Sequence, residues 1–199
     1  MFSKYTEERT FATILSFGCV IIGVAYILSL LLEVPLAPQL LDMGPPYSIA
    51  IVYGIAVTIP MVVLLKAFMN STYPPFLRFR EDQIEFISRL GFKLTSSRIL
   101  LISLVAGIGE ELLFRGVFQT YLSNQGPLLL SIIIPNILFG LLHARTIAYA
   151  LIAGAAGCYF GIVFVLTGSL IVPILAHALY DFVALAIARR EIEQRQVKV

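Results

Sequence analysis

Ionisable side chains are scarce in the second half of this chain, and the few that occur have helical spacing. Residues 99–188 contain five formal charges and both histidines of the protein. Each ionised group costs about 2.5 to 3.5 kcal/mol inside hydrocarbon even on a lenient insertion scale, so it normally faces a partner or a wet cavity. We expect Arg145 to anchor a helix end and take the other six as candidate functional residues: Glu110, Glu111, Arg115, His143, His177 and Asp181.

The two adjacent glutamates differ in the partner that the sequence offers them. Glu111 and Arg115 are four residues apart, so on a helix they share a face and can form an ion pair. Glu110 points about 100° away from Glu111 and has no such partner. A carboxyl left alone among apolar helices is driven towards its neutral form, which suits general acid or base catalysis. We therefore expect Glu110 to be the reactive carboxyl.

Each histidine also has a helical neighbour four residues away. His177 precedes Asp181, and Phe139 precedes His143. An aspartate one turn from a histidine can orient the ring, stabilise imidazolium or, if protonated, donate a hydrogen bond itself. The plainer interpretation is that these polar groups only hold helices together. We favour chemistry, because such contacts usually use Ser, Thr or Asn and do not need two histidines and three carboxylates.

The composition shows where these residues must work. Of the 199 residues, 59% are apolar and 13% are charged, the net charge is +2, and the mean hydropathy is +0.92. A soluble domain would be about a quarter charged, so we predict an all-α, polytopic bundle of transmembrane helices. The same figures exclude a disordered chain, a disulfide-stapled secreted domain and a nucleic-acid-binding surface. Cys19 and Cys158 lie in apolar runs and are expected to pack.

Six predominantly apolar runs are candidate membrane spans, which need about 20 residues, although the fourth is short. Lys and Arg cluster before the first run, between the second and third, and after the fourth and sixth, which predicts cytoplasmic termini. We treat residues 1–199 as one membrane domain: two N-terminal spans (1–69), a polar cytoplasmic connection (70–98), a four-helix catalytic core (99–188) and a polar tail (189–199). The predicted spans are residues 11–32, 47–65, 99–121, 127–142, 147–166 and 169–188.

Features between and within the spans complete this prediction. In the polar connection, Ile84, Ile87 and Leu90 recur at helical spacing and predict a short surface helix, although a solvated linker also fits. In the fifth span, Gly154, Gly157 and Gly161 form a small-residue face, which we interpret as helix packing.

The span bounds put Glu110 and His177 near mid-membrane but leave His143 closer to the cytoplasmic surface. That difference requires a tilt, a kink or a shifted helix end.

Taken in order, the motifs Glu110-Glu111-x-x-Phe114-Arg115, Phe139-x-x-x-His143 and His177-x-x-x-Asp181 resemble those of a known family. This is the family of CAAX proteases and bacteriocin-processing enzymes, the Abi-type intramembrane glutamic endopeptidases. The resemblance covers roughly residues 97–188.

The resemblance implies a role for each motif. Glu110 would activate a water molecule with the help of His143, and His177 with Asp181 would stabilise the oxyanion. Glu111, Arg115 and Phe139 would be supporting residues. This chain departs from the family at Asp181, where Asn is usual, so orienting His177 is the better assignment for that residue.

Other functions stay open at this stage. The histidines and glutamates could supply a zinc site, although no H-E-x-x-H motif is present and we expect no cofactor. A noncatalytic scaffold or immunity-type protein, which binds and regulates another membrane protein, is the main alternative to an endopeptidase. A proton-coupled transporter is a weaker one. The expected partners are the lipid bilayer and a peptide or membrane-protein substrate, prenylated tails and bacteriocin leaders included. Six short-looped spans favour a bacterial plasma membrane.

Overall fold

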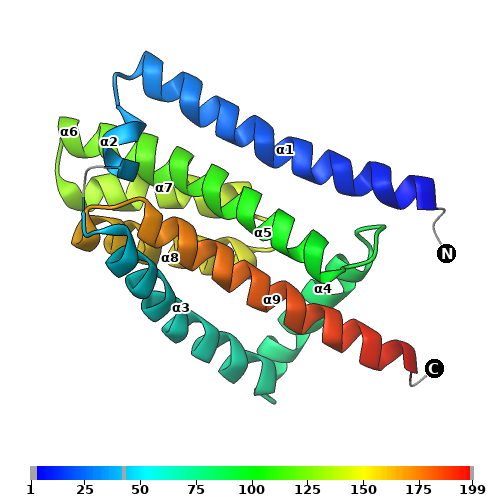
Figure 1. The fold of residues 1–199 in the computed structure, drawn as a ribbon. Coiled ribbons are helices and arrows are strands. Elements are labelled where there is room, and N and C mark those ends of the chain that lie inside the picture. The colour runs from blue at the N-terminus through cyan, green and yellow to red at the C-terminus, as the bar shows by residue number, and fades with distance from the viewer. Residues whose placement is uncertain (1–3, 42–43, 198–199) are drawn as a thin grey trace.

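The protein is built from helices, as its apolar runs predict. The computed structural model describes residues 4–41 and 44–197, and no strand occurs among them. An all-α polytopic bundle is therefore confirmed (Figure 1). The elements are α1 (Lys4–Leu31), α2 (Leu36–Leu41), α3 (Tyr47–Asn70), α4 (Pro74–Ser88), α5 (Ser96–Glu111), the π-helix η1 (Leu112–Gln119), α6 (Thr120–Gln125), α7 (Leu128–Leu142), α8 (Ile147–Thr167) and α9 (Ile171–Val197).

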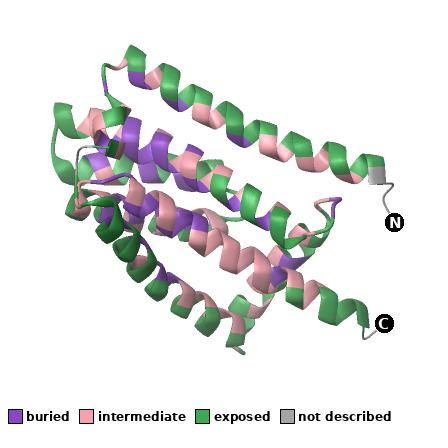
Figure 2. Ribbon diagram, viewed as in Figure 1, coloured by how far each residue is buried: buried purple, intermediate pink, exposed green. Residues whose placement is uncertain are grey.

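Among the residues that the structure describes, four helices are long and apolar enough to cross a membrane by themselves. They are α1, α3, α8 and α9, with 21 to 27 residues in their apolar segments. The predicted third span is a continuous rod made of α5, η1 and α6, and the fourth is α7, which has only 15 residues. Much of α1 and most of α3 are exposed (Figure 2), and many of these exposed residues are large and apolar, as lipid contact requires. The count of six spans stays a prediction.

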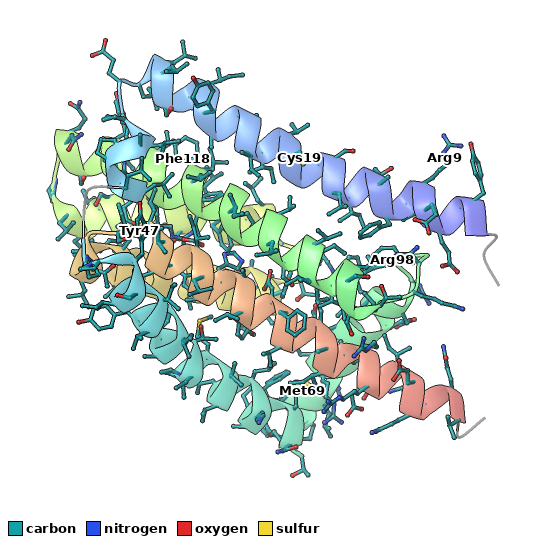
Figure 3. The ribbon with its side chains drawn as sticks, in the orientation of Figure 1. Arg9, Cys19, Tyr47, Met69, Arg98 and Phe118 are labelled. Atoms are coloured by element: carbon teal, nitrogen blue, oxygen red, sulfur yellow. The ribbon has the colours of Figure 1, made fainter. Side chains whose placement is uncertain are left out.

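The ends of the described chain lie on one side of the bundle. Figure 1 shows the start of α1, the end of α9 and the helix α4 together at that side. There Arg98, at the start of α5, donates to Glu8 at 2.7 Å (Figure 3). Termini on the same side agree with an even number of spans.

The polar connection contains a real helix. Pro74 begins α4 at the first helical position, where its missing amide N–H costs nothing. Thr95 caps the N-terminus of α5, because its side chain accepts from the backbone N–H of Arg98 at 3.3 Å. The tail is helical too, since α9 continues nine residues beyond the predicted end of its span, to Val197. Arg195 of this extension donates to both carboxylate oxygens of Glu81 in α4.

The helix that carries Glu110 and Glu111 changes from α-helical to π-helical hydrogen bonding directly after Glu111. The α-helix α5 ends at Glu111, and residues Leu112–Gln119 form the π-helix. Turns of this kind are rare and are often found at functional sites. No pattern of residues predicted this π-helix, whose buried residues include Phe114, Arg115 and Gln119.

Candidate active site

Glu110, His143 and His177 come from different helices and meet at one point. The carboxylate oxygen Oε2 of Glu110 lies 3.9 Å from Nε2 of His143 and 3.9 Å from Nε2 of His177. Glu110 is at the end of α5, His143 directly follows α7, and His177 is in the first half of α9. A separation of 3.9 Å is too long for a direct hydrogen bond and suits a bridging water molecule.

Both imidazole rings are held by their other nitrogen. Nδ1 of His143 lies 2.8 Å from the backbone carbonyl oxygen of Phe139, and Nδ1 of His177 lies 2.7 Å from Oε1 of Glu111. A carbonyl or an ionised carboxylate only accepts, so each Nδ1 must carry the proton and donate it. Each Nε2 is then turned towards Glu110, and the rings cannot rotate without losing a hydrogen bond.

Asp181 lies beside His177, one turn further along α9. Its Oδ2 is 3.5 Å from Nε2 of His177, so the predicted pairing within this helix is present. His177 therefore has a carboxylate near each ring nitrogen, Glu111 at Nδ1 and Asp181 at Nε2. Two carboxylates stabilise the imidazolium form, in which Nε2 also becomes a hydrogen-bond donor.

The predicted ion pair between Glu111 and Arg115 is also present, and it is fully buried. Nε of Arg115 lies 3.1 Å from Oε2 of Glu111, Nη1 donates to Oε1 at 3.2 Å, and both side chains have 0% exposure. The hydrogen bond from His177 to Glu111 was not predicted. It joins residues 66 positions apart, and no local spacing indicates such a contact.

Three ordered motifs thus converge at one place in the bundle. Residues 93–183 match the family described as type II CAAX prenyl endopeptidase Rce1-like. This match confirms the resemblance that the motifs indicate, over slightly less than half of the chain. The Rce1-like segment runs from just before α5 into α9 and contains all six candidate functional residues.

The other comparisons are weaker. The chain is 26% identical over 134 residues to a Bacillus subtilis (strain 168) protein named "Uncharacterized protein YpbD". The alignment covers 66% of this chain and 65% of that relative, so the chain spans about two thirds of its length. No solved structure matches the chain significantly.

Aromatic rings enclose the histidines of the Rce1-like segment. Phe139 packs on His143 with ring centroids 4.4 Å apart and also lies under the guanidinium of Arg115 at 5.4 Å. Phe160 of α8 stacks on His177 at 5.0 Å with an angle of 13° between the rings. Phe139 was predicted from its position four residues before His143, whereas no spacing pointed to Phe160.

The glycine face of α8 serves polar contacts as well as packing. The backbone carbonyl of Gly157 accepts from Nη2 of Arg115, and that of Gly161 accepts from Nε2 of Gln119 at 3.0 Å. A Cβ at Gly157 would lie 2.3 Å from Oδ1 of Asn136. Interpreting this face as packing alone was therefore incomplete. The glycines leave room for buried polar side chains to reach the backbone of α8.

The short helix α7 explains how His143 reaches the depth of the other site residues. Fifteen residues extend about 22 Å, less than the hydrocarbon core of about 30 Å. The helix α7 therefore ends short of a full crossing, and His143 is the first residue after it. Arg145 follows in the loop between α7 and α8, at a helix end as predicted, and donates to Gln83 of α4 at 3.1 Å.

The expectation that no cofactor is bound stays a prediction. Within residues 4–41 and 44–197, no group of three or more His, Cys, Asp or Glu side chains is gathered closely enough to hold a metal ion. His177 also directs Nδ1 to Glu111, which leaves a single nitrogen of that ring facing Glu110.

Proposed function

We propose that this protein is an intramembrane endopeptidase in which Glu110 activates a water molecule to attack a peptide bond. One observation carries the proposal: a single carboxylate oxygen faces two imidazole nitrogens at 3.9 Å, and both rings are fixed by hydrogen bonds on their far side. The Rce1-like match supports the same class of reaction.

In the proposed first step, the water lies between Glu110 and His143. It donates one hydrogen to Oε2 of Glu110 and the other to Nε2 of His143, which is free to accept because Nδ1 carries the proton. Glu110 takes its proton as the water oxygen bonds to the carbonyl carbon of the substrate. In the second step, protonated Glu110 delivers this proton to the amide nitrogen, and the C–N bond breaks.

His177 supplies the positive end of the site in this scheme. Its imidazolium form, stabilised by Glu111 and Asp181, donates from Nε2 to the oxygen that becomes negative in the tetrahedral intermediate. Asp181 thereby acts through His177 and need not be protonated. The parallel ring of Phe160 adds a face that favours a cation.

The substrates we propose are membrane-associated or lipidated peptides and proteins. The exposed apolar side chains of α1, α3 and α7 support a site that is approached from the lipid phase. A bacterial plasma membrane with cytoplasmic termini is proposed as the location, supported by the Lys and Arg distribution and by the match to a bacterial protein.

The test compares protein termini by mass spectrometry in cells that contain the wild-type protein, Glu110→Gln or Glu193→Gln. Glu193 is a matched control, because it is a carboxyl on α9 with 65% exposure and lies outside the site. We expect specific new termini with the wild type and the control, and none with Glu110→Gln at equal membrane levels. Identical termini in all three, with a phenotype on gene deletion, would favour the scaffold alternative.

A further inference from the structure

Asn136 contacts the Arg115 side chain of the candidate site, although it belongs to none of the three sequence motifs. It lies in α7, directly after Pro135, and its side chain is 1% exposed. Its Nδ2 donates to the backbone carbonyl of Ile132 at 2.7 Å, and its Oδ1 accepts from Nη2 of Arg115 at 2.9 Å. A buried amide that is satisfied at both ends is held in one orientation.

The guanidinium of Arg115 depends on this contact for its position. Its donors are divided between Glu111 on one side and Asn136 with the Gly157 carbonyl on the other. A planar guanidinium has fixed donor directions, so anchoring one edge also sets the direction of the other. The edge that faces Glu111 is therefore determined by α7 and α8.

We infer that Asn136 is a positioning residue of the site: it anchors Arg115, which fixes the Glu111 carboxylate that holds His177 by Nδ1. The chain of contacts runs from Asn136 to Arg115 at 2.9 Å, from Arg115 to Glu111 at 3.2 Å and from Glu111 to His177 at 2.7 Å. Its members are buried, since Asn136, Arg115, Glu111 and His177 are 6% exposed or less. The inference rests on the proposed function for its effect on catalysis, but its structural part is independent of any reaction.

A matched pair of variants separates this role from ordinary core stability. Asn136→Leu and Gln119→Leu each remove a buried side-chain amide that lies against the glycine face of α8. Gln119 is 2% exposed and donates to the Gly161 carbonyl, but no hydrogen bond to Arg115 or Glu111 is found for it within the described residues. Only Asn136→Leu removes a hydrogen bond of Arg115, which then keeps the Gly157 carbonyl as its sole hydrogen-bond partner on α8.

The direct readout is the protonation of the His177 ring. The chain has two histidines, so histidine-selective ¹⁵N labelling in detergent gives two ring spectra, which His143→Gln assigns. We expect wild type and Gln119→Leu to show a protonated Nδ1 in His177 with a strong hydrogen bond. In Asn136→Leu this signal should shift or broaden. Unchanged His177 signals in folded Asn136→Leu would overturn the inference, whether or not the protein cleaves peptides.

A second variant covers the case in which Asn136→Leu does not accumulate. Asn136→Asp keeps an oxygen for Arg115, loses the donor to Ile132 and adds a negative charge that pairs with the guanidinium. We therefore expect Arg115 to stay anchored and the His177 signals to stay close to those of the wild type. A displaced His177 signal in folded Asn136→Asp would contradict the inference.

Steady-state kinetics also distinguish a positioning role from a role in stability. The substrate is the peptide that spans the cleavage site found by terminus analysis. Asn136→Leu should lower kcat about 10- to 100-fold with little change in KM, as is typical when a partner behind an active-site ligand is removed. Gln119→Leu should keep kcat within a few-fold. Equal kcat losses in the two variants would assign Asn136 to stability alone.

Discussion

Removing the charge of Arg115 should destabilise the protein far more than removing any surface arginine. Arg115→Met leaves the Glu111 carboxylate with the His177 ring but without the permanent charge of the guanidinium, in a place where Glu111 and Arg115 both have 0% exposure. Breaking a buried pair from one side costs about 3 to 5 kcal/mol, because the remaining charge is uncompensated. The lost hydrogen bonds to Asn136 and Gly157 act in the same direction. We therefore expect the free energy of unfolding to fall by about 4 kcal/mol.

The chain contains an internal control for this experiment. Glu85 and Arg89 in and after α4 form a pair with the same order and spacing, but their side chains are 58% and 76% exposed. Arg89→Met should change the free energy of unfolding by at most about 1 kcal/mol, as solvent-exposed pairs do. The two pairs share their spacing, so the difference between the two losses of stability reports the effect of burial.

Two more variants test the physical reason for the loss. Arg115→Lys keeps the charge but cannot contact Glu111, Asn136 and Gly157 together, so we expect an intermediate loss of about 2 kcal/mol. Glu111→Gln combined with Arg115→Met removes both charges and should recover about 2 kcal/mol relative to Arg115→Met alone. The assay is denaturant unfolding in detergent, followed by far-UV circular dichroism. A loss below about 1 kcal/mol in Arg115→Met would refute this account of the buried pair.

Three further predictions concern the ring stack, the surface and the metal. Phe160→Leu should lower kcat about 2- to 12-fold by removing the ring stacked on His177; steady-state kinetics measure this, and an unchanged kcat would contradict it. The Arg195 guanidinium holds the pKa of Glu81 below its ordinary value, so this contact stabilises above about pH 4.3 and is lost as the pH falls through the lowered value. The protection of the α4 amides against hydrogen exchange, corrected for the intrinsic pH dependence of exchange, should therefore fall in acid in the wild type and be less pH-dependent in Glu81→Gln, and equal profiles would oppose this. Chelators should leave peptide cleavage unchanged, whereas a loss reversed by zinc would support the metal mechanism.

Local spacing predicted the parts of the site that lie within one helix. The Glu111–Arg115 pair and the neighbours His177 and Asp181 are four residues apart, and helix geometry alone brings such residues together. The apolar runs likewise predicted helices, because a backbone in hydrocarbon must satisfy its own hydrogen bonds. The choice of Glu110 as the unpaired carboxyl followed from the same reasoning.

Contacts between helices could not be predicted in this way. The hydrogen bond from His177 to Glu111 and the anchoring of Arg115 by Asn136 join distant parts of the sequence. The depth of His143 depended on α7 ending short of a full crossing, which hydropathy does not reveal. The π-helix after Glu111 is equally invisible, since it differs from an α-helix in hydrogen-bond register and not in composition.

The central claim, that Glu110 is the general base, is tested most directly by kcat of the purified protein and of Glu110→Gln. The substrate is the peptide that spans the cleavage site identified in cells, and Glu193→Gln is the control. We predict that Glu110→Gln lowers kcat by about 10² to 10⁴ while the fold and KM are kept. A Glu110→Gln protein that cleaves the peptide within a few-fold of the wild-type rate would contradict the claim.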